Sequence, residues 1–201
     1  MKSGARGNIK RTVMAKINES QPHSIFFITD YADLGSTETI RKILHEATIN
    51  GILEKAGHGI YIKPKVSRFG NVPVPLEKIA REIAKRDKCD ILPTGSTAAN
   101  LIGLSTQVPM NLSYITTGST RTINIKGRKI SFSHASPKNF AAKGTVMPLL
   151  IQGMREIGEG NISASEYDAI KFFIDKQEDP YLQEDLLLAP VWIQRIIKKM
   201  M

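Results

Sequence analysis

The sequence predicts an α+β protein of two domains, divided near residue 66. Three observations indicate this. Amphipathic helices and a glycine-centred hairpin occupy residues 1–66, a proline-rich segment follows, and the rest of residues 67–201 combines a small sheet with several C-terminal helices. The chain has 201 residues and 41% hydrophobic content, so each domain can bury a core of its own.

The first expected elements are a helix and a short buried strand. The helix covers about residues 7–18, because its apolar side chains recur at helical spacing: Ile9, Val13, Met14 and Ile17. The apolar run Ile25–Ile28 is typical of a buried strand. Residues 29–34 then predict a short capped helix that runs into a turn at Gly35.

A second long helix is expected to begin near Thr37. Ser36 or Thr37 can cap it, since a hydroxyl accepts backbone N–H groups that lack helical partners, and Gly51 is a natural stop. One face forms an apolar stripe at i, i+3, i+4 and i+7, made of Ile40, Ile43, Leu44 and Ala47. The stripe predicts that this face is buried.

The opposite face of this helix carries Arg41, Lys42 and His45. Their donors suit phosphates and base edges in the major groove of DNA, although Glu38 and Ile49 interrupt the face. The simpler alternative is a solvated charged face, which is the usual role of such residues on a helix. The elements that follow favour the DNA-binding interpretation.

A hairpin is predicted directly after the helix. Residues 52–55 and 60–63 have strand character, the glycines within residues 56–59 permit a tight turn, and Pro64 ends the second strand. The order helix, strand, helix, helix, hairpin is that of a winged helix-turn-helix DNA-binding domain, although some winged helices contact only proteins. The expected DNA-binding residues are Thr37, Arg41, Lys42, His45, Lys55 and His58.

The segment 64–75 is expected to link the two domains, because its three prolines and one glycine disfavour both helix and central strand. Residues 76–88 then predict a helix. After it, a strand at residues 91–92 runs through Gly95 into a helix that Ser96 or Thr97 could cap. A phosphate-binding loop is disfavoured here, because the lysine of a Walker loop and the glycine spacing of a dinucleotide site are both missing.

The remainder of the second domain is predicted to contain three strands and four helices. The strands cover residues 111–117, 122–125 and 129–133, and the last two form a hairpin with its tip at residues 126–128. The helices cover about residues 145–157, 163–176, 178–188 and 191–201. Ser163 and Glu166 have the spacing of a capping box.

The net charge of +9 is concentrated in the middle of the chain. No Asp or Glu occurs from Ile91 to Arg155, whereas basic residues recur throughout that stretch. A polyanion or an acidic protein surface is therefore the expected partner, and a generally basic surface that aids solubility is the alternative. The candidate face for a partner or nucleic acid consists of Arg121, Lys126, Arg128, Lys129 and Lys138.

Other chemistry has little support in the sequence. Cys89 is the only cysteine, so we expect a structural thiol without an internal disulfide. The four histidines share no metal-ligand spacing. A metal-dependent nuclease needs clustered carboxylates, and the stretch from Ile91 to Arg155 has none, with Asp90 alone at its edge, so we expect no catalytic residue, metal or cofactor. No apolar run approaches the ~20 residues that cross a bilayer, so a cytoplasmic location without a membrane partner is expected.

Residues 93–109, PTGSTAANLIGLSTQVP, follow the winged-helix pattern and the proline-rich segment in an order that resembles AbiEi-type antitoxins of type IV toxin–antitoxin systems. The basic hairpin over residues 120–133 and the helical end of the chain fit the same family, and the resemblance covers about residues 8–160. It implies a repressor that binds double-stranded DNA at inverted repeats in its own promoter. It also implies that the second domain neutralises a nucleotidyltransferase-like toxin. The alternatives are a solitary winged-helix regulator and a nucleic-acid-processing enzyme.

Overall fold

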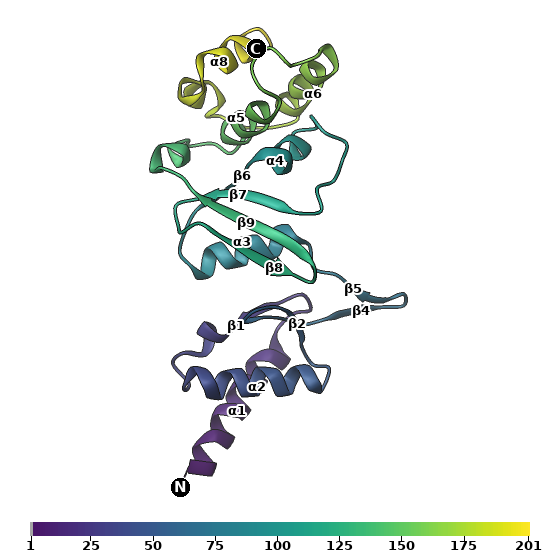
Figure 1. Ribbon diagram of the computed structural model, residues 1–201, viewed down its shortest axis with the longest axis vertical. Coiled ribbons are helices and arrows are strands. Elements are labelled where there is room, and N and C mark those ends of the chain that lie inside the picture. Colours follow the sequence, from purple (N-terminus) through teal and green to yellow (C-terminus); the bar gives the residue numbers. More distant parts are fainter. Residues whose placement is uncertain (1) are drawn as a thin grey trace. The chain divides into compact units, whose positions relative to one another are not determined.

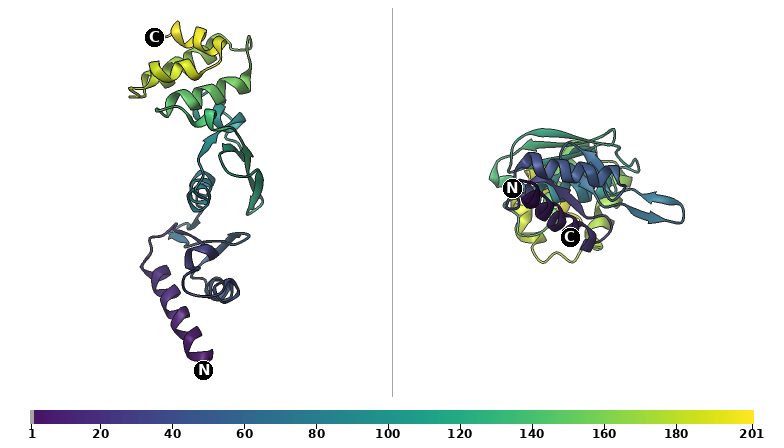
Figure 2. Two further views of the ribbon diagram at one scale, coloured as in Figure 1. Left: turned by 90° about the vertical axis from the view of Figure 1, so that its left-hand side faces the viewer. Right: turned by 90° about the horizontal axis from the view of Figure 1, so that it is seen from below.

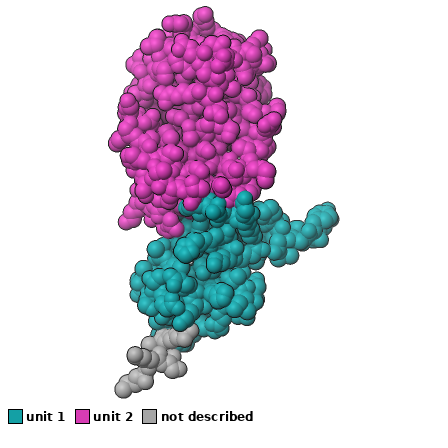
Figure 3. Space-filling view, viewed as in Figure 1, with its two compact units in different colours: residues 1–82, 123–127 teal, residues 83–122, 128–201 magenta. Residues whose placement is uncertain are grey.

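A computed structural model describes residues 2–201, with side chains from Gly7 onward, as eight α-helices and three small β-sheets (Figure 1). The chain forms two compact units (Figure 3). The first comprises residues 1–82 and 123–127, and the second comprises residues 83–122 and 128–201. Helices and small sheets occur in both units, which confirms the α+β class.

In the first unit, two helices accompany a three-stranded antiparallel sheet. Its elements in chain order are α1 (Lys2–Glu19), β1 (Ile25–Phe27), a 3-10 helix (Ile28–Tyr31), α2 (Thr37–Ile49), β2 (Glu54–Gly57) and β3 (Ile60–Ile62). The strand order is β1-β3-β2, with Ile25 opposite Ile62 and Lys55 opposite Tyr61. The predicted order of elements is confirmed, although α1 is longer than expected and the short helix after β1 is a single 3-10 turn.

Helix α2 begins and ends close to where its sequence predicts. The Thr39 N–H donates to the Ser36 hydroxyl at 3.3 Å, so Ser36, not Thr37, is the cap. Gly51 follows the helix with a φ of +70°, a conformation that favours glycine. The apolar stripe is buried in one core with side chains of α1 and the sheet, which contains Val13, Ile17, Phe26, Ile40, Ile43, Leu44, Ala47 and Tyr61.

The predicted linker, residues 64–75, contains a β-hairpin that was not expected. Strands β4 (Lys65–Ser67) and β5 (Gly70–Val72) form a two-stranded sheet. His23 Nε2 donates a hydrogen bond to the carbonyl of Val72 at 2.9 Å, which ties β5 to the chain before β1. The prolines of this segment exclude a central strand but not this hairpin, because they lie outside both strands.

Most of a four-stranded mixed sheet belongs to the second unit, although residues 123–125 of its strand β8 (Arg121–Ile125) are grouped with the first. Helix α3 (Leu76–Arg86) precedes the sheet, and the division between the units falls within that helix. The strand order is β6-β7-β9-β8, with β6 antiparallel to β7 and β7 parallel to β9. The strands are β6 (Ile91–Pro93), β7 (Leu112–Thr116), β8 (Arg121–Ile125) and β9 (Arg128–His134), in agreement with the predicted strands.

Five helices complete the second unit. They are α4 (Gly95–Leu101), α5 (Val146–Ile157), α6 (Ala164–Asp175), α7 (Leu182–Asp185) and α8 (Val191–Lys198). Figures 1 and 2 show α5, α6 and α8 gathered beside α4. Their shared core includes Ala99, Ile102, Leu150, Met154, Ile170, Ile193 and Ile197.

Two predictions about this unit are wrong in detail. Neither Ser96 nor Thr97 caps α4, because the residue at the N-cap position is Thr94. The Thr97 hydroxyl instead accepts a hydrogen bond from the Ser113 N–H of β7 at 2.9 Å. The helix predicted over residues 178–188 is also shorter. It consists of α7 and a 3-10 turn at Leu186–Leu188. By contrast, the capping box that precedes α6 is present as predicted.

Candidate functional site

The charged face of α2 and the β2–β3 hairpin meet at one hollow of about 190 Å³. Five of the six residues predicted to contact DNA line it. They come from two elements, since α2 contributes Arg41, Lys42 and His45 and the hairpin contributes Lys55 and His58. All five residues are solvent-exposed. The structure therefore brings together side chains that are up to 17 positions apart in the sequence, from Arg41 to His58.

The sixth predicted residue, Thr37, does not line this hollow. It is exposed and is the first residue of α2, directly after the cap. The backbone N–H groups of a first helical turn lack intrahelical partners and carry partial positive charge, so this position can still meet an anion. Thr37 would then act at the end of the helix and not through the hollow.

One acidic side chain, Glu38, forms ion pairs with this cationic face, and no other does so among the described residues. Its carboxylate lies 2.9 Å from Arg41 Nη1 and 3.3 Å from Lys42 Nζ. The three side chains are each more than half exposed, so these pairs are weak and water competes for both partners. A phosphate that approaches α2 can therefore replace Glu38 as the partner of Arg41 and Lys42 at little cost.

Sequence reasoning missed Tyr61, which also lines the hollow. This side chain comes from β3, and all three residues of that strand are buried. Burial raises the pKa of the Tyr61 phenol, while the charge of Arg41 partly opposes the shift. The phenol is therefore a neutral hydrogen-bond donor beside Arg41. The sequence did contain one signal for this residue, a tyrosine between two isoleucines in a predicted strand. When such a ring is buried, its hydroxyl usually needs a hydrogen-bond partner, so it tends to lie at a polar surface.

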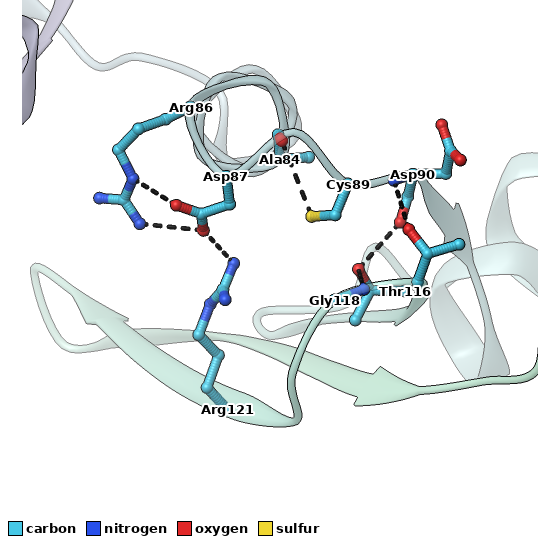
Figure 4. Close-up of polar contacts among 9 residues, drawn as sticks. Ala84, Arg86, Asp87, Cys89, Asp90, Thr116, Gly118 and Arg121 are labelled. Atoms are coloured by element: carbon cyan, nitrogen blue, oxygen red, sulfur yellow. Dashed lines mark hydrogen bonds and ion pairs between the residues drawn. The ribbon is translucent and has the colours of Figure 1, made fainter.

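The five basic residues predicted as a face of the second domain have different surroundings, and Arg121 is held by neighbours (Figure 4). It forms an ion pair with Asp87 and lies over the Phe132 ring, with 5.1 Å between the guanidinium carbon and the ring centroid. Arg86 also donates to Asp87, at 2.7 Å from Nε and 3.0 Å from Nη2. The Arg86 hydrogen bonds and, to a smaller extent, the Arg121 charge hold the pKa of Asp87 below its usual value.

Arg128 and Lys126 also have partners within the chain. Arg128 donates to the backbone carbonyls of Met110 at 2.6 Å and Pro109 at 3.4 Å, so it fixes the loop before β7. Lys126 forms an ion pair with Glu54. Lys129 and Lys138 are exposed, and Lys138 lines a second hollow. At least three of the five predicted cations therefore have structural contacts that a partner would have to displace.

The segment around Gly95 offers a poor place for a phosphate. Gly95 has a φ of +58°, and a carboxylate oxygen of Glu156 lies 3.5 Å from the position that a Cβ on Gly95 would occupy. Negative charge at this turn opposes an anion. At the end of α3, the Cys89 thiol contacts the Ala84 carbonyl at 3.7 Å (Figure 4), a structural role for the only cysteine.

Among the side chains that the structure describes, from Gly7 to Met201, no group of three His, Cys, Asp or Glu residues is placed to hold a metal ion. Among the described helices, none is both long and apolar enough to cross a bilayer.

Comparison with protein families matches residues 12–182 to a family of unknown function, DUF6088. The chain belongs to the DUF6088 family. No curated protein matches the sequence. The region matched to DUF6088 includes all of α2, the β2–β3 hairpin and the sheet of the second unit, and it ends at the first residue of α7. The hollow beside α2 therefore lies within the part of the chain that the family describes.

Proposed function

We propose that this DUF6088 protein is a DNA-binding transcriptional repressor whose first unit is a winged helix-turn-helix. In this proposal, α2 is the recognition helix in the major groove and the β2–β3 hairpin is the wing. The element order and the β1-β3-β2 strand order support it, because this domain type places a helix ahead of such a hairpin.

The observation that carries the proposal is the hollow shared by α2 and the hairpin. Arg41, Lys42 and His45 all face the same side of α2, and Lys55 and His58 extend that surface onto the hairpin. A row of cations on a helix and an adjoining hairpin can bind phosphates on both sides of a groove. In this arrangement, α2 reads base edges and the wing contacts mainly the backbone.

The antitoxin role belongs to the same proposal and rests on the resemblance to AbiEi-type proteins. The repressor would bind inverted repeats in its own promoter, and its second unit would neutralise a nucleotidyltransferase-like toxin. The acid-free stretch from Ile91 to Arg155 is compatible with an acidic partner surface. If no toxin partner exists, the first unit still supports a solitary winged-helix regulator.

Binding to DNA tests the proposal directly. Fluorescence anisotropy of the full-length protein would be measured on the DNA upstream of its own gene and on scrambled DNA of equal length. We expect tight binding to the first and weaker binding to the second. Arg41→Ala should lower the affinity by about 10-fold to 100-fold, because each good base contact is worth about 1–3 kcal/mol. Lys42→Ala and His45→Ala should also weaken binding.

Lys78→Ala is the matched control. Lys78 is an exposed cation of α3 in the same unit and does not line the hollow, so its loss changes the net charge equally. We expect a much smaller effect from it. Unchanged affinity for all three α2 variants, or an equal loss with Lys78→Ala, would refute this assignment of the recognition helix. The logarithm of the affinity should also fall with the logarithm of the salt concentration, by a slope of about 0.9 for each phosphate contacted.

The antitoxin part is tested separately with the product of the adjacent gene. If that product is nucleotidyltransferase-like, co-expression should relieve its toxicity and the two proteins should co-purify. Continued toxicity with no complex would reject the antitoxin role and leave the DNA-binding proposal intact. An enzyme would be revealed by turnover of DNA, RNA or nucleotides with Mg²⁺ that is lost in Asp90→Ala.

A further inference from the structure

The second unit contains a hollow of about 330 Å³ whose lining combines two cations, a buried amide and apolar walls. Lys138 and Arg155 provide the charges, from the 3-10 helix at Pro137–Phe140 and from the last turn of α5. The walls include Leu92, Ile151 and Leu188. This volume lies near the lower end of the range for small-molecule sites, about 300–1,000 Å³.

Gln152 is the most informative residue of this hollow. Its side chain lines the hollow although the residue is only 7% exposed. The Thr94 hydroxyl donates to its Oε1 at 2.8 Å, which fixes the orientation of the amide. No hydrogen bond among the described residues engages the Nε2 group, so this amide offers its N–H donors to the hollow. Solvent reaches this nitrogen in the hollow, where a ligand with an acceptor atom can take the place of water.

The charges of the hollow point to an anion. No Asp or Glu is among its described lining residues, and no ion pair of the described chain engages Lys138 or Arg155. Glu156 is the nearest acid in sequence, but its carboxylate lies beside Gly95 and not in the lining. Lys138 and Arg155 are both exposed, line one hollow and have no acidic partner among the described residues. Such a pair of cations is suited to bind a phosphate or a carboxylate.

We infer that this hollow binds a small organic anion of about the size of a nucleoside monophosphate. Lys138 and Arg155 would bind its phosphate or carboxylate, the Gln152 amide would donate to an acceptor on its ring, and the ring would lie against Leu92 and Ile151. The site lies wholly in the second unit. The inference goes beyond the proposed function and does not depend on DNA binding.

Isothermal titration calorimetry on the full-length protein tests this site. The probes are the four common nucleoside monophosphates, benzoate, indole-3-acetate and inorganic phosphate. We expect at least one organic anion to bind, with affinity reduced about 10-fold or more in the Lys138→Ala/Arg155→Ala double variant, because charged hydrogen bonds are the strong ones. Gln152→Leu, which keeps the side-chain volume, should weaken the same probe.

The matched control is the Lys129→Ala/Lys198→Ala double variant, which removes two cations of the same unit that do not line the hollow. It should bind the probe as the unaltered protein does. The inference is overturned if no organic probe binds at millimolar concentration, or if inorganic phosphate binds as tightly as the best organic probe. It is also overturned if both double variants lose affinity equally.

Discussion

The carboxylate of Asp185 accepts a hydrogen bond from the backbone N–H of Gly144 at 2.7 Å, across 41 positions of sequence. It also accepts the Lys143 N–H at 3.0 Å. Asp179 accepts the next two N–H groups, those of Thr145 and Val146, each at 3.0 Å. Because Thr145 provides no side-chain cap for α5, Asp179 performs that role from the segment before α7. Asp185, within α7, holds the loop that leads into α5.

Asp185→Ala should therefore destabilise the second unit. Asp185 is only 2% exposed, and its removal leaves two half-buried backbone N–H groups without their acceptor. We expect a loss of about 2–4 kcal/mol in the free energy of unfolding, measured by urea denaturation. Glu184→Ala is the control, because Glu184 is exposed and its ion pair is with the exposed Lys143 side chain. Equal stability of the two variants would contradict this role for Asp185.

Two helical glycines should respond to alanine with opposite signs. In α5, a Cβ on Gly153 would lie 2.4 Å from Cδ1 of Ile102 and 3.3 Å from the Ala98 carbonyl, and Ile102 is itself buried. Gly153→Ala should thus destabilise the protein by about 1–2 kcal/mol through overpacking. Gly7→Ala in α1, where nothing lies within 4 Å, should stabilise it by about 0.5–1 kcal/mol. Thermal unfolding of both variants measures the difference.

Asp87 should make stability depend on acid pH. Arg86 and Arg121 lower its folded-state pKa, so the paired carboxylate stabilises the fold above the unfolded pKa of about 4 and this stability is lost as pH falls through the folded value. Asp87→Asn should weaken the protein at pH 7 and flatten its response between pH 5 and pH 2. The measurement is the urea midpoint at each pH. A variant that loses as much stability in acid as the unaltered protein would exclude this contribution.

The C-terminal helices should be required for folding. A chain that stops after Leu182, where the family match ends, lacks Leu186, Ile193 and Ile197, which are buried in the core of the second unit. Burial of each such side chain is worth about 1.5–3 kcal/mol, so their joint loss approaches the whole stability of a typical domain. We expect an unfolded second unit by circular dichroism. Removal of exposed Met201 alone should have no effect.

The sequence predicted those parts of the fold that local patterns specify. The stripe from Ile40 to Ala47 defined α2, and the glycines around His58 defined the hairpin after it. The hairpin at β4–β5 was missed because its prolines suggested a linker, although they flank the strands and leave the ladder N–H groups in place. Prolines in a segment therefore argue against a central strand of a sheet, but they do not argue against a separate two-stranded hairpin.

The sequence predicted a candidate site only where its charged residues lie close together in one element. Arg41, Lys42 and His45 could be grouped because they lie within about one and a half turns of one helix. The ion pair between Arg121 and Asp87 could not be predicted from the sequence, because the two residues meet only when α3 and β8 are in place. The predicted helix over residues 145–157 places Arg155 beside Gln152, at i and i+3, but nothing in the sequence brings Lys138 to them.

The β4–β5 hairpin described above also determines where a protease should first cut the native chain. Its turn presents Arg68 and Phe69, and the phenylalanine is 85% exposed. Trypsin and chymotrypsin cleave after these two residue types, and exposed turn tips are preferred sites of nicking. Brief digestion with either enzyme should therefore produce the same pair of large fragments, with an N-terminal piece that retains α1, α2 and the β1-β3-β2 sheet for separate study.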